Sequence, residues 1–407
     1  MDTLAGDIRY ALRRLRAHPG FTAIVVLTLA FGIGANSALF SVVNTVLLRP
    51  LPYAEPDRLV TIQHDYPSLK LEAPVSAPGF RDYHDHTQLF TNVAVEGDWQ
   101  ANLTGLGDPQ RLRGTMVSGD FFRTYGVLPE LGRTLLPDED LPGHNRVVVL
   151  SHGLWQRLYG SRPDAVGRTM SLNGVGYTIV GVMPSSFHDF WSTDAEIFTP
   201  LALADSDFEP SKYTNEYLQL TARLKPGVTL EQAQRDMRAF AAQLRQAHPD
   251  AIPSQWTLGV KSLTEMGTGD IRPALFVLLG AVGFVLLIAC ANVANLLLAR
   301  AAGRAKEVAI RTALGARRRD LVRQLLVEST IMSLLGAALG LVLAYSGVRA
   351  LVAANPTNIP RVSELSIDGH VLLFTLGMAL ITGVLFGIAP ALQMSRADMH
   401  NTLKEGG

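Results

Sequence analysis

The sequence predicts an α+β membrane protein with four transmembrane helices and a large mixed α/β extracytoplasmic domain between the first and second helices. Hydrophobic residues make up 48% of the 407 residues and charged residues 18%, a balance that is unusual for a soluble chain of this length. Four stretches of 20 or more residues carry no charge, and about 20 apolar residues are enough to cross the hydrocarbon layer of a membrane. The long segment between the first two stretches alternates strand-like and helix-like patterns, which predicts a folded domain.

The four uncharged stretches define the expected domain organisation. The first is too long for the core of a signal peptide, so we expect it to remain as an anchor. A buried helix of a soluble core is the alternative for any one stretch, but four of them in one chain favour a membrane. We therefore expect an amphipathic interfacial helix at 1–20, an external domain at 49–272, a cytoplasmic segment at 300–323, a tail at 396–407, and transmembrane helices at 21–48, 274–299, 329–348 and 371–395.

The placement of Lys and Arg predicts the orientation, because these residues collect in short cytoplasmic loops. Basic residues gather in the first 20 positions and throughout 300–323, whereas only two lie between the third and fourth spans. We expect both termini and the 300–323 segment to be cytoplasmic and the large domain to lie outside. The equal numbers of basic and acidic residues, 36 of each, give no indication of a nucleic-acid partner.

The interiors of the four stretches contain no Asp, Glu, Lys, Arg or His, which argues against a proton- or ion-driven carrier. Small residues recur there at a spacing that lets helix backbones approach closely, and a few amides can hydrogen-bond between helices. We expect helix packing at Gly336, Gly340, Gly383 and Gly387, and interhelical hydrogen bonds from Asn292 and Asn295.

The cytoplasmic segment 300–323 has two interpretations. Helix-forming residues run from Ala305 to Leu314, Gly315 can end the helix, and three arginines follow. A short amphipathic helix below the membrane could dock into a groove of a soluble partner. A basic loop that only fixes the orientation is the alternative, and the composition does not separate the two.

In the external domain, the sequence pattern predicts a strand, a helix and a strand, and this order occurs twice. The first unit has strands at 59–64 and 91–96 around a helix at 78–90, and the second has strands at 217–224 and 256–263 around a helix at 229–247. We expect the two halves to pack as one α+β layer, with residues near 99–214 inserted between them. The insert contains a hairpin that turns at Asn173–Gly174.

The sequence gives little support for catalysis or metal binding. Asp82, His84, Asp85 and His86 lie close together and could bind a metal, but no third strong ligand follows at a defined spacing, so a solvated helix face is the favoured interpretation. Ser151 precedes His152 without the motif that surrounds a nucleophilic serine. The single cysteine, Cys290, lies inside the second span. We expect no catalytic residue, no metal and no disulfide.

A phosphate-binding loop is also missing from the sequence. Such a loop needs a lysine directly after a glycine, and none of the six lysines has one before it. If ATP powers this protein, ATP and magnesium are expected on a partner chain, with no cofactor on this one.

Several motifs resemble ABC transporter permeases of the MacB/FtsX type. The segment EVAIRTALGA at 307–316 resembles their cytoplasmic signature, with Thr312 where a second basic residue is common, and the external domain shares SGDFF at 118–122 and VVVLS at 147–151. The N-terminal part resembles one half of the duplicated permeases first noted in acidobacteria (ADOP), through DIRYALR at 7–13, TLAFGIGAN at 28–36 and LRPLP at 48–52. Those proteins usually carry two halves, so this chain is expected to be a truncated or split form, or a half that pairs with another chain.

The resemblance implies a dimeric permease in which residues 273–395 form an FtsX-like domain and residues 49–272 a MacB-like periplasmic core. A cytoplasmic ATPase would drive the external domain through the four spans, with export of an unknown substrate as the outcome. The resemblance implies that the 300–323 segment contains a coupling helix, with docking positions at Glu307, Ile310, Arg311, Leu314 and Gly315. The alternatives are an FtsX-like signalling protein that regulates an external enzyme and, least favoured, a membrane-anchored metallohydrolase built on His84 and His86.

Overall fold

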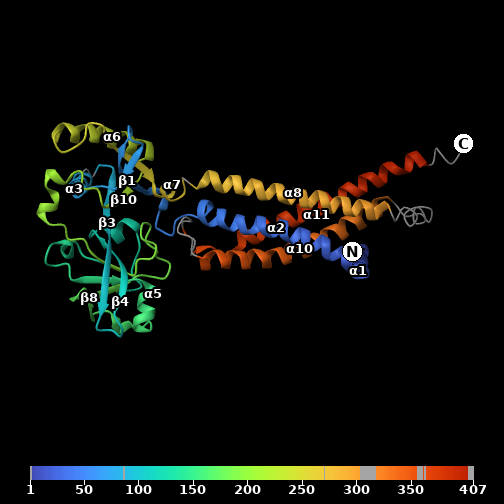
Figure 1. Ribbon diagram of the computed structural model, residues 1–407, viewed down its shortest axis with the longest axis horizontal. Coiled ribbons are helices and arrows are strands. Elements are labelled where there is room, and N and C mark those ends of the chain that lie inside the picture. The colour runs from blue at the N-terminus through green and yellow to red at the C-terminus, as the bar shows by residue number, and fades with distance from the viewer. Residues whose placement is uncertain are drawn as a thin grey trace. The chain divides into compact units, whose positions relative to one another are not determined.

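The computed structural model describes residues 2–85, 88–269, 271–302, 318–354, 361 and 364–401. They form two compact units. One unit joins Met1–Arg49 to Asp270–Gly407 and is helical, and the other spans Pro50–Gly269 and is built on a β-sheet (Figure 1). The large domain thus lies between the first and second long helices, as the sequence predicts.

Within its described residues, the helical unit contains four helices that are long and apolar enough to cross a membrane. The candidate spans are Pro19–Leu48, Arg272–Ala299, Val322–Ala354 and Gly369–Ile388. They belong to α2 (Pro19–Val43, continued by the π-helical turn η1, Asn44–Leu48), α8 (Arg272–Ala302), α10 (Arg318–Ala354) and α11 (Gly369–Asn401). Four spanning helices are therefore confirmed. The third candidate span begins at Val322 and not at the predicted residue 329, because α10 continues through charged turns that end the uncharged run.

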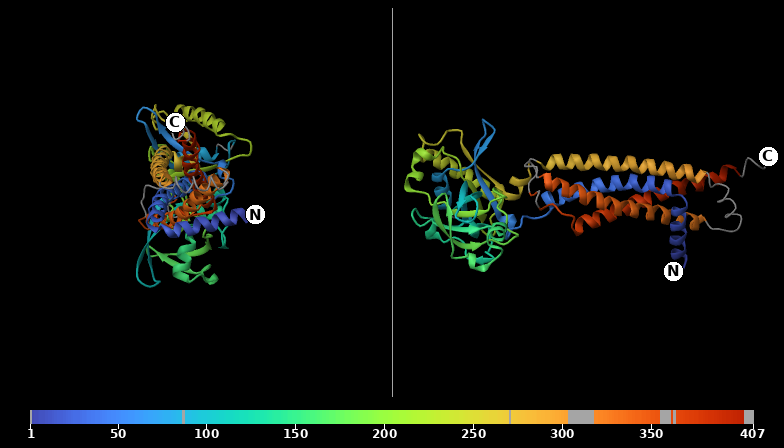
Figure 2. Two further views of the ribbon diagram at one scale, coloured as in Figure 1. Left: turned by 90° about the vertical axis from the view of Figure 1, so that its right-hand side faces the viewer. Right: turned by 60° about the horizontal axis from the view of Figure 1, so that its bottom comes forward.

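Helix α1 (Asp2–Ala17) precedes the four long helices. It ends where Pro19 begins α2, because the proline lacks the backbone N–H that would continue the first helix. In the right-hand view of Figure 2, α1 turns away from the axis of α2. Its Ala11 and Leu15 are buried, whereas Ile8 and Leu12 remain exposed.

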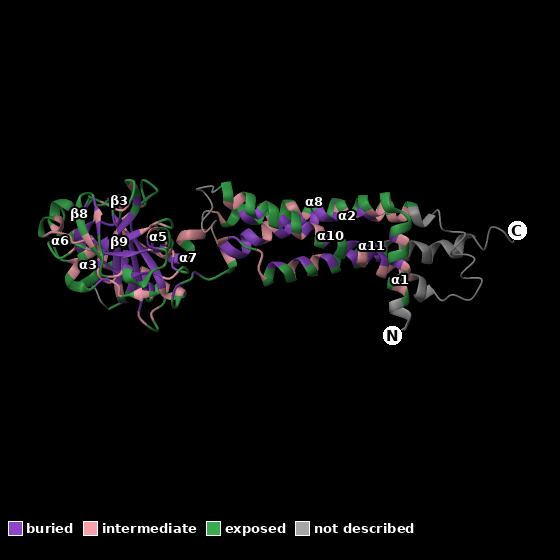
Figure 3. Cartoon of the chain, turned by 90° about the horizontal axis from the view of Figure 1, so that it is seen from below, coloured by how far each residue is buried: buried purple, intermediate pink, exposed green. Residues whose placement is uncertain are grey.

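The long helices pack around two apolar clusters. Helix α10 packs against α2 on one side and α11 on the other, and α8 lies beside α2 and α11. Figure 3 shows buried residues turned inward and exposed residues along the outer surfaces of the bundle. The exposed residues are largely apolar, among them Phe276, Val285 and Leu373. An apolar surface of this extent is what lipid would cover in a membrane.

The second unit contains one sheet of eleven strands. Nine of them follow the order β11-β1-β10-β3-β4-β9-β6-β8-β5, while β2 pairs with β1, and β7 pairs with β3 and β8. The strands are β1 (Leu59–Tyr66), β2 (Leu71–Ala73), β3 (Phe90–Thr104), β4 (Gln110–Val117), β5 (Leu131–Gly132), β6 (Val147–Leu150), β7 (Thr169–Leu172), β8 (Val175–Val182), β9 (Ile197–Pro200), β10 (Gln219–Leu224) and β11 (Thr257–Ser262).

The two predicted strand-helix-strand units interleave. Helix α3 (Ala77–Asp85) connects β1 to β3, and α6 (Leu230–Ala247) connects β10 to β11. Because the spatial order is β11-β1-β10-β3 with antiparallel neighbours, each pair of connected strands is separated by one strand of the other unit. This is the split β-α-β arrangement of ferredoxin-like domains. The Thr229 side chain accepts a hydrogen bond from Gln232 N at 3.2 Å and caps α6.

The insert continues the sheet instead of forming a separate layer. Strand β3 was predicted at 91–96 but runs to Thr104, since its second half pairs with β4. Gly97 and Asp98 are poor strand formers and end the sequence pattern, yet Met116 and Thr115 hold them in register. The predicted helix at 78–90 is likewise shorter, because Phe90 already belongs to β3. The hairpin of β7 and β8 turns at Asn173–Gly174, as predicted, with positive φ angles of 51° and 79°.

Candidate functional site

The predicted docking positions Glu307, Ile310, Arg311, Leu314 and Gly315 lie outside the described residues. The structure describes the helices on either side of them, α8 up to Ala302 and α10 from Arg318. Any force applied to the segment 303–317 would therefore enter the protein through α8 and α10. The contacts that α10 makes with its neighbours form the candidate site.

Two ion pairs tie α1 to the beginning of α10. Arg323 Nε lies 2.6 Å from Asp7 Oδ2, and Arg14 donates to Glu328 Oε2 at 3.0 Å. The Glu328 side chain is only 3% exposed, and Arg14 contributes to the compensation of its charge. The sequence interpretation did not single out Glu328, although an acidic residue directly before an uncharged run is a recognisable signal. Through these pairs α1 would follow a displacement of α10.

Three glycines bring the backbones of α2 and α10 into contact. A Cβ atom on Gly34 would lie 2.7 Å from the carbonyl oxygen of Gly340, and one on Gly340 would lie 2.8 Å from the carbonyl oxygen of Ala30. A Cβ atom on Gly336 would lie 2.7 Å from Cβ of Leu29. Real Cβ atoms do not approach other atoms this closely, so only glycine permits this helix pair.

The pair α10 and α11 combines glycine contacts with hydroxyl hydrogen bonds. A Cβ atom on Gly383 would lie 2.9 Å from Thr330 Cα, and one on Gly387 would lie 2.5 Å from Leu326 Cδ2. Ser329 Oγ donates to the Gly383 carbonyl at 2.7 Å. One turn further, Ser333 Oγ donates to the Ala379 carbonyl at 2.6 Å and meets Thr382 Oγ1 at 2.7 Å. These bonds satisfy the hydroxyls inside the apolar bundle.

Helix α2 uses polar side chains in the same way. Asn36 Nδ2 donates to the Val282 carbonyl of α8 at 3.1 Å, and Ser37 Oγ lies 2.7 Å from Thr375 Oγ1 of α11. Asn292 and Asn295 differ from the prediction: both are exposed on α8, and within the described part of the chain neither makes an interhelical hydrogen bond. The interhelical amide is Asn36 instead, because it faces the α8 backbone whereas the two predicted asparagines face outward.

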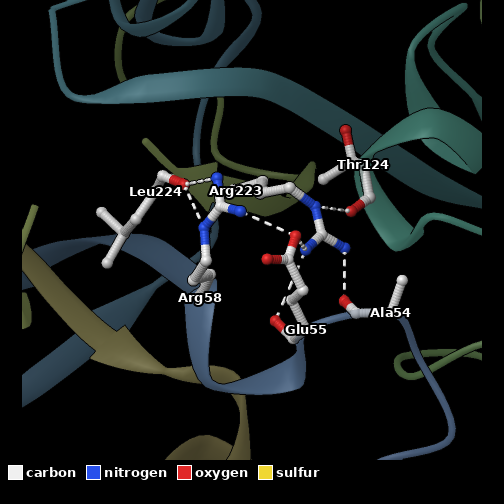
Figure 4. A network of polar contacts seen from close by, with 6 residues as sticks. All are labelled: Ala54, Glu55, Arg58, Thr124, Arg223 and Leu224. Atoms are coloured by element: carbon white, nitrogen blue, oxygen red, sulfur yellow. Dashed lines mark hydrogen bonds and ion pairs between the residues drawn. The ribbon is translucent and has the colours of Figure 1, made fainter. Parts of the chain in front are cut away.

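A buried arginine holds the first residues of the external domain by hydrogen bonds (Figure 4). Arg223 of β10 donates through Nε to the Thr124 carbonyl at 2.9 Å and through Nη2 to the Ala54 carbonyl at 2.7 Å. Next to it, Arg58 donates to the Leu224 carbonyl at 2.9 and 2.6 Å and to Glu55 Oε2 at 2.6 Å. Burial lowers the pKa of Arg223, but an arginine remains charged in proteins. The network joins residues 54–58 to the sheet.

A pair of buried carboxyl groups lies in the same unit. Glu96 of β3 and Asp189 are 3% and 2% exposed, and each carboxyl group influences the pKa of the other. Burial raises the pKa of Asp189 to about 7 and raises that of Glu96 well above its usual range. Among the described residues, neither oxygen of the buried Asp189 side chain accepts a hydrogen bond, so a negative charge there would lack compensation. We infer that this pair of carboxyl groups retains at least one proton near neutral pH.

Arg223 and Glu96 were not recognised from the sequence. Each stands inside a run of buried strand residues, where a charged side chain is costly unless it is paired. A charged residue at an inward-facing strand position was therefore the available signal. Asp189 lies in a loop and carried no such signal.

The residues considered for metal binding have other partners. Asp82 accepts a hydrogen bond from Tyr213 Oη, and His84 lies 3.3 Å from Asp85 and 3.9 Å from Asp120. The nearby Asp120 carboxylate raises the pKa of His84. His86 lies outside the described residues, and no group of three His, Cys, Asp or Glu side chains suited to a metal occurs among those the structure describes.

The serine considered as a nucleophile caps a helix. Ser151 Oγ accepts a hydrogen bond from Leu154 N at 3.2 Å at the start of α5 (His152–Tyr159). His152 lies 2.8 Å from Glu130 and does not hydrogen-bond to the serine. The observed role of Ser151 is therefore that of an N-cap.

Comparisons with known proteins match both parts of the chain. Residues 22–240 match the MacB-like periplasmic core domain, and residues 279–399 match the FtsX-like permease C-terminal domain. The macrolide export ATP-binding/permease protein MacB of Escherichia coli K12 is 28% identical over 289 residues, which cover 70% of this chain and 42% of that protein. The chain thus spans less than half the length of the curated relatives it matches.

Solved structures of external domains are also similar. The periplasmic region of MacB from Actinobacillus actinomycetemcomitans has a TM-score of 0.40 and 13% identity, covering 56% of this chain and 97% of that one. The extracellular domain of the transporter YknZ from Gram-positive bacteria has a TM-score of 0.35 and 13% identity, covering 49% of this chain and 99% of that one. On the strength of the two domain matches, the chain belongs to the family that carries a MacB-like periplasmic core domain followed by an FtsX-like permease domain.

Proposed function

We propose that this chain is the permease subunit of an ABC transporter and that it transmits ATP-driven motion from a cytoplasmic ATPase to its external domain. The central observation is that α10, which directly follows the 303–317 segment, contacts α1, α2 and α11 through ion pairs, glycine contacts and hydroxyl hydrogen bonds. Because α10 is bonded to three neighbouring helices, a displacement of α10 would move them as well. The transport outcome is the export or efflux of a substrate.

The orientation follows from the basic residues. The N-terminus, the 300–323 segment and the C-terminus are cytoplasmic, and residues 50–269 lie on the opposite side of the cell membrane. The exposed Ile8 and Leu12 of α1 face the acyl chains, while Arg9, Arg13 and Arg16 reach anionic headgroups. Helix α1 thus rests at the inner membrane surface.

The ATPase docks on the 303–317 segment. From the sequence, we expect Ile310 and Leu314 to supply an apolar face, Glu307 and Arg311 to supply charge, and Gly315 to end the helix. ATP and magnesium belong to the partner, which has the phosphate-binding loop that this sequence lacks. A second permease copy or a separate permease half completes the dimer.

Affinity capture from detergent-solubilised membranes tests this function. The tagged full chain is expected to retain a subunit that hydrolyses ATP, and Leu314→Asp is expected to reduce its recovery roughly tenfold or more, since it places a charge in an apolar contact. Arg304→Gln lies in the same segment but outside the docking positions, so it should recover the ATPase normally. The proposal fails if the wild-type chain captures no ATPase under conditions that preserve a known permease complex.

An FtsX-like signalling function is the second candidate. The match at 279–399 favours it, as does a bundle whose hydroxyls bond to neighbouring helices. The same motion would then switch an external enzyme instead of moving a substrate. Loss of the gene separates the two functions: a transporter changes substrate export or drug resistance, whereas a signalling protein changes cell-wall hydrolysis.

A further inference from the structure

The end of the first span, just before the external domain, is not a regular α-helix. Residues Asn44–Leu48 form a π-helical turn, closed by a hydrogen bond from Arg49 N to the Asn44 carbonyl at 2.8 Å. Turns of this kind are rare and are often found at functional sites, because the wider winding disturbs the regular hydrogen-bond ladder of the helix. Carbonyl groups at such a turn need partners from elsewhere.

One arginine supplies two of those partners. Arg361 Nη1 donates to the Thr45 carbonyl and to the Arg49 carbonyl, both at 3.0 Å. Its Nε and Nη2 atoms bind the two oxygens of Glu364 at 3.0 and 2.7 Å. The two side chains are only 11% and 17% exposed, so the pair is held in place and largely shielded from water. The backbone of Arg361 has a φ of 58°, which few residues other than glycine adopt.

Two more hydrogen bonds join the end of the first span to the residues just before α11. Asn44 Nδ2 donates to Asp368 Oδ2 at 2.9 Å, and Ser41 Oγ donates to the Ser366 carbonyl at 2.8 Å. The other oxygen of Asp368 accepts from the backbone N–H groups of His370 and Val371 at 3.0 and 3.1 Å and so caps α11. The last two turns of the first span are thus bonded to the residues that begin the fourth.

We propose that Arg361 is a positioning residue that fastens the exit of the first span to the beginning of α11, so that a displacement of α11 is passed to Arg49. This rests on the proposed function, because it needs a motor that moves the bundle. Arg49 ends the first segment of the helical unit, and Pro50 is the first residue of the external domain. Motion that reaches Arg49 therefore enters the external domain along the chain. Without Arg361, the π-helical turn could unwind and absorb the displacement.

Hydrogen exchange on the full chain in lipid nanodiscs tests the fastening without an ATPase. Arg361→Gln removes the charge and the paired geometry, and we expect the Arg49 amide to exchange roughly tenfold faster or more, while amides in the middle of α2 keep their rates. The control is Arg349→Gln, since Arg349 lies in α10 near the Tyr345 ring and makes none of these bonds. Glu364→Gln is a milder second variant with the same expected direction. Unchanged exchange at Arg49 in both Arg361→Gln and Glu364→Gln overturns the proposal.

The complex with the captured ATPase tests the positioning role. In the wild type, ATP should change the exchange rates of residues 50–58. In Arg361→Gln that change should fall roughly fivefold or more, while the ATP hydrolysis rate stays within about twofold, because the motor itself is intact. An undiminished ATP-dependent change, or an equal loss of hydrolysis, overturns the role. Failure to capture an ATPase would instead refute the proposed function, and the exchange rate of Arg49 would still decide whether the fastening exists.

Discussion

The contact between α2 and α10 gives the most quantitative prediction. Gly340→Ala would place a methyl group 2.8 Å from the Ala30 carbonyl oxygen and 3.0 Å from the Gly34 nitrogen. Both atoms belong to the backbone and cannot rotate away, so the helices must separate. Overpacking of this kind costs about 1–3 kcal/mol, whereas alanine favours a helix over glycine by about 0.5–1 kcal/mol. We expect a net loss of about 1–2 kcal/mol in the free energy of unfolding.

The matched control lies on the same helix. A Cβ atom on Gly347 meets nothing within 4 Å, so Gly347→Ala should be neutral or slightly stabilising. The two variants should then differ by about 2 kcal/mol, roughly a 30-fold difference in the unfolding equilibrium constant. The measurement is unfolding of the full chain in mixed micelles, followed by the helical circular dichroism signal. Equal stability of Gly340→Ala and Gly347→Ala would refute the close backbone contact.

Three further predictions concern the buried charges. Burial raises the folded-state pKa of Asp189 to about 7, so its contribution to stability is complete below the unfolded-state pKa near 3.8 and is lost as the pH rises through 7. The melting temperature, followed by tryptophan fluorescence between pH 5 and 9, should therefore fall with rising pH in the wild type. In Asp189→Asn the melting temperature should lose this dependence on pH. Arg223→Leu leaves buried carbonyls without donors and should lower the free energy of unfolding by at least about 2 kcal/mol, compared with about 0.5 kcal/mol or less for the exposed Arg113→Leu. Glu328→Gln removes the charge that holds Arg14 and should make α1 more sensitive to trypsin.

Each of these predictions has an outcome that contradicts it. A stability profile of Asp189→Asn that keeps the wild-type dependence on pH would show that the carboxyl pair does not hold the proton. Equal melting temperatures of Arg223→Leu and Arg113→Leu would show that the buried network contributes no more than a surface ion pair. Unchanged cleavage within α1 in Glu328→Gln would show that the helix is held mainly by its apolar residues.

The sequence predicted the membrane helices because a single property, the absence of charge over about 20 residues, determines whether a segment can cross the hydrocarbon layer. Their ends were less predictable. Helix α10 continues into turns that carry Arg323 and Glu328, since charges at a helix end can pair with another helix. The spacing of Gly336 and Gly340 suggested packing, but only the structure shows that their neighbour is α2 and that Gly34 completes the contact.

The external domain was predicted as two strand-helix-strand units with an insert, because strand and helix periodicities are local properties of the sequence. The strand order was not predictable in the same way, since it depends on pairings between residues far apart in the chain. The buried carboxyl groups of Glu96 and Asp189 illustrate this limit, because one lies on β3 and the other in a loop, and they influence each other only in the folded domain. Arg223 similarly reaches Ala54 across 169 positions of the sequence.

The central claim is that the helical bundle carries motion from a cytoplasmic motor to the external domain. The most direct measurement places a fluorophore on Leu128→Cys, where the side chain is 82% exposed, in a Cys290→Ser background that leaves no other thiol on this chain. With the captured ATPase in nanodiscs, ATP should change the emission of this label, and Leu314→Asp should abolish the change. An emission that ATP leaves unchanged in the wild-type complex, while ATP is hydrolysed, would contradict the account.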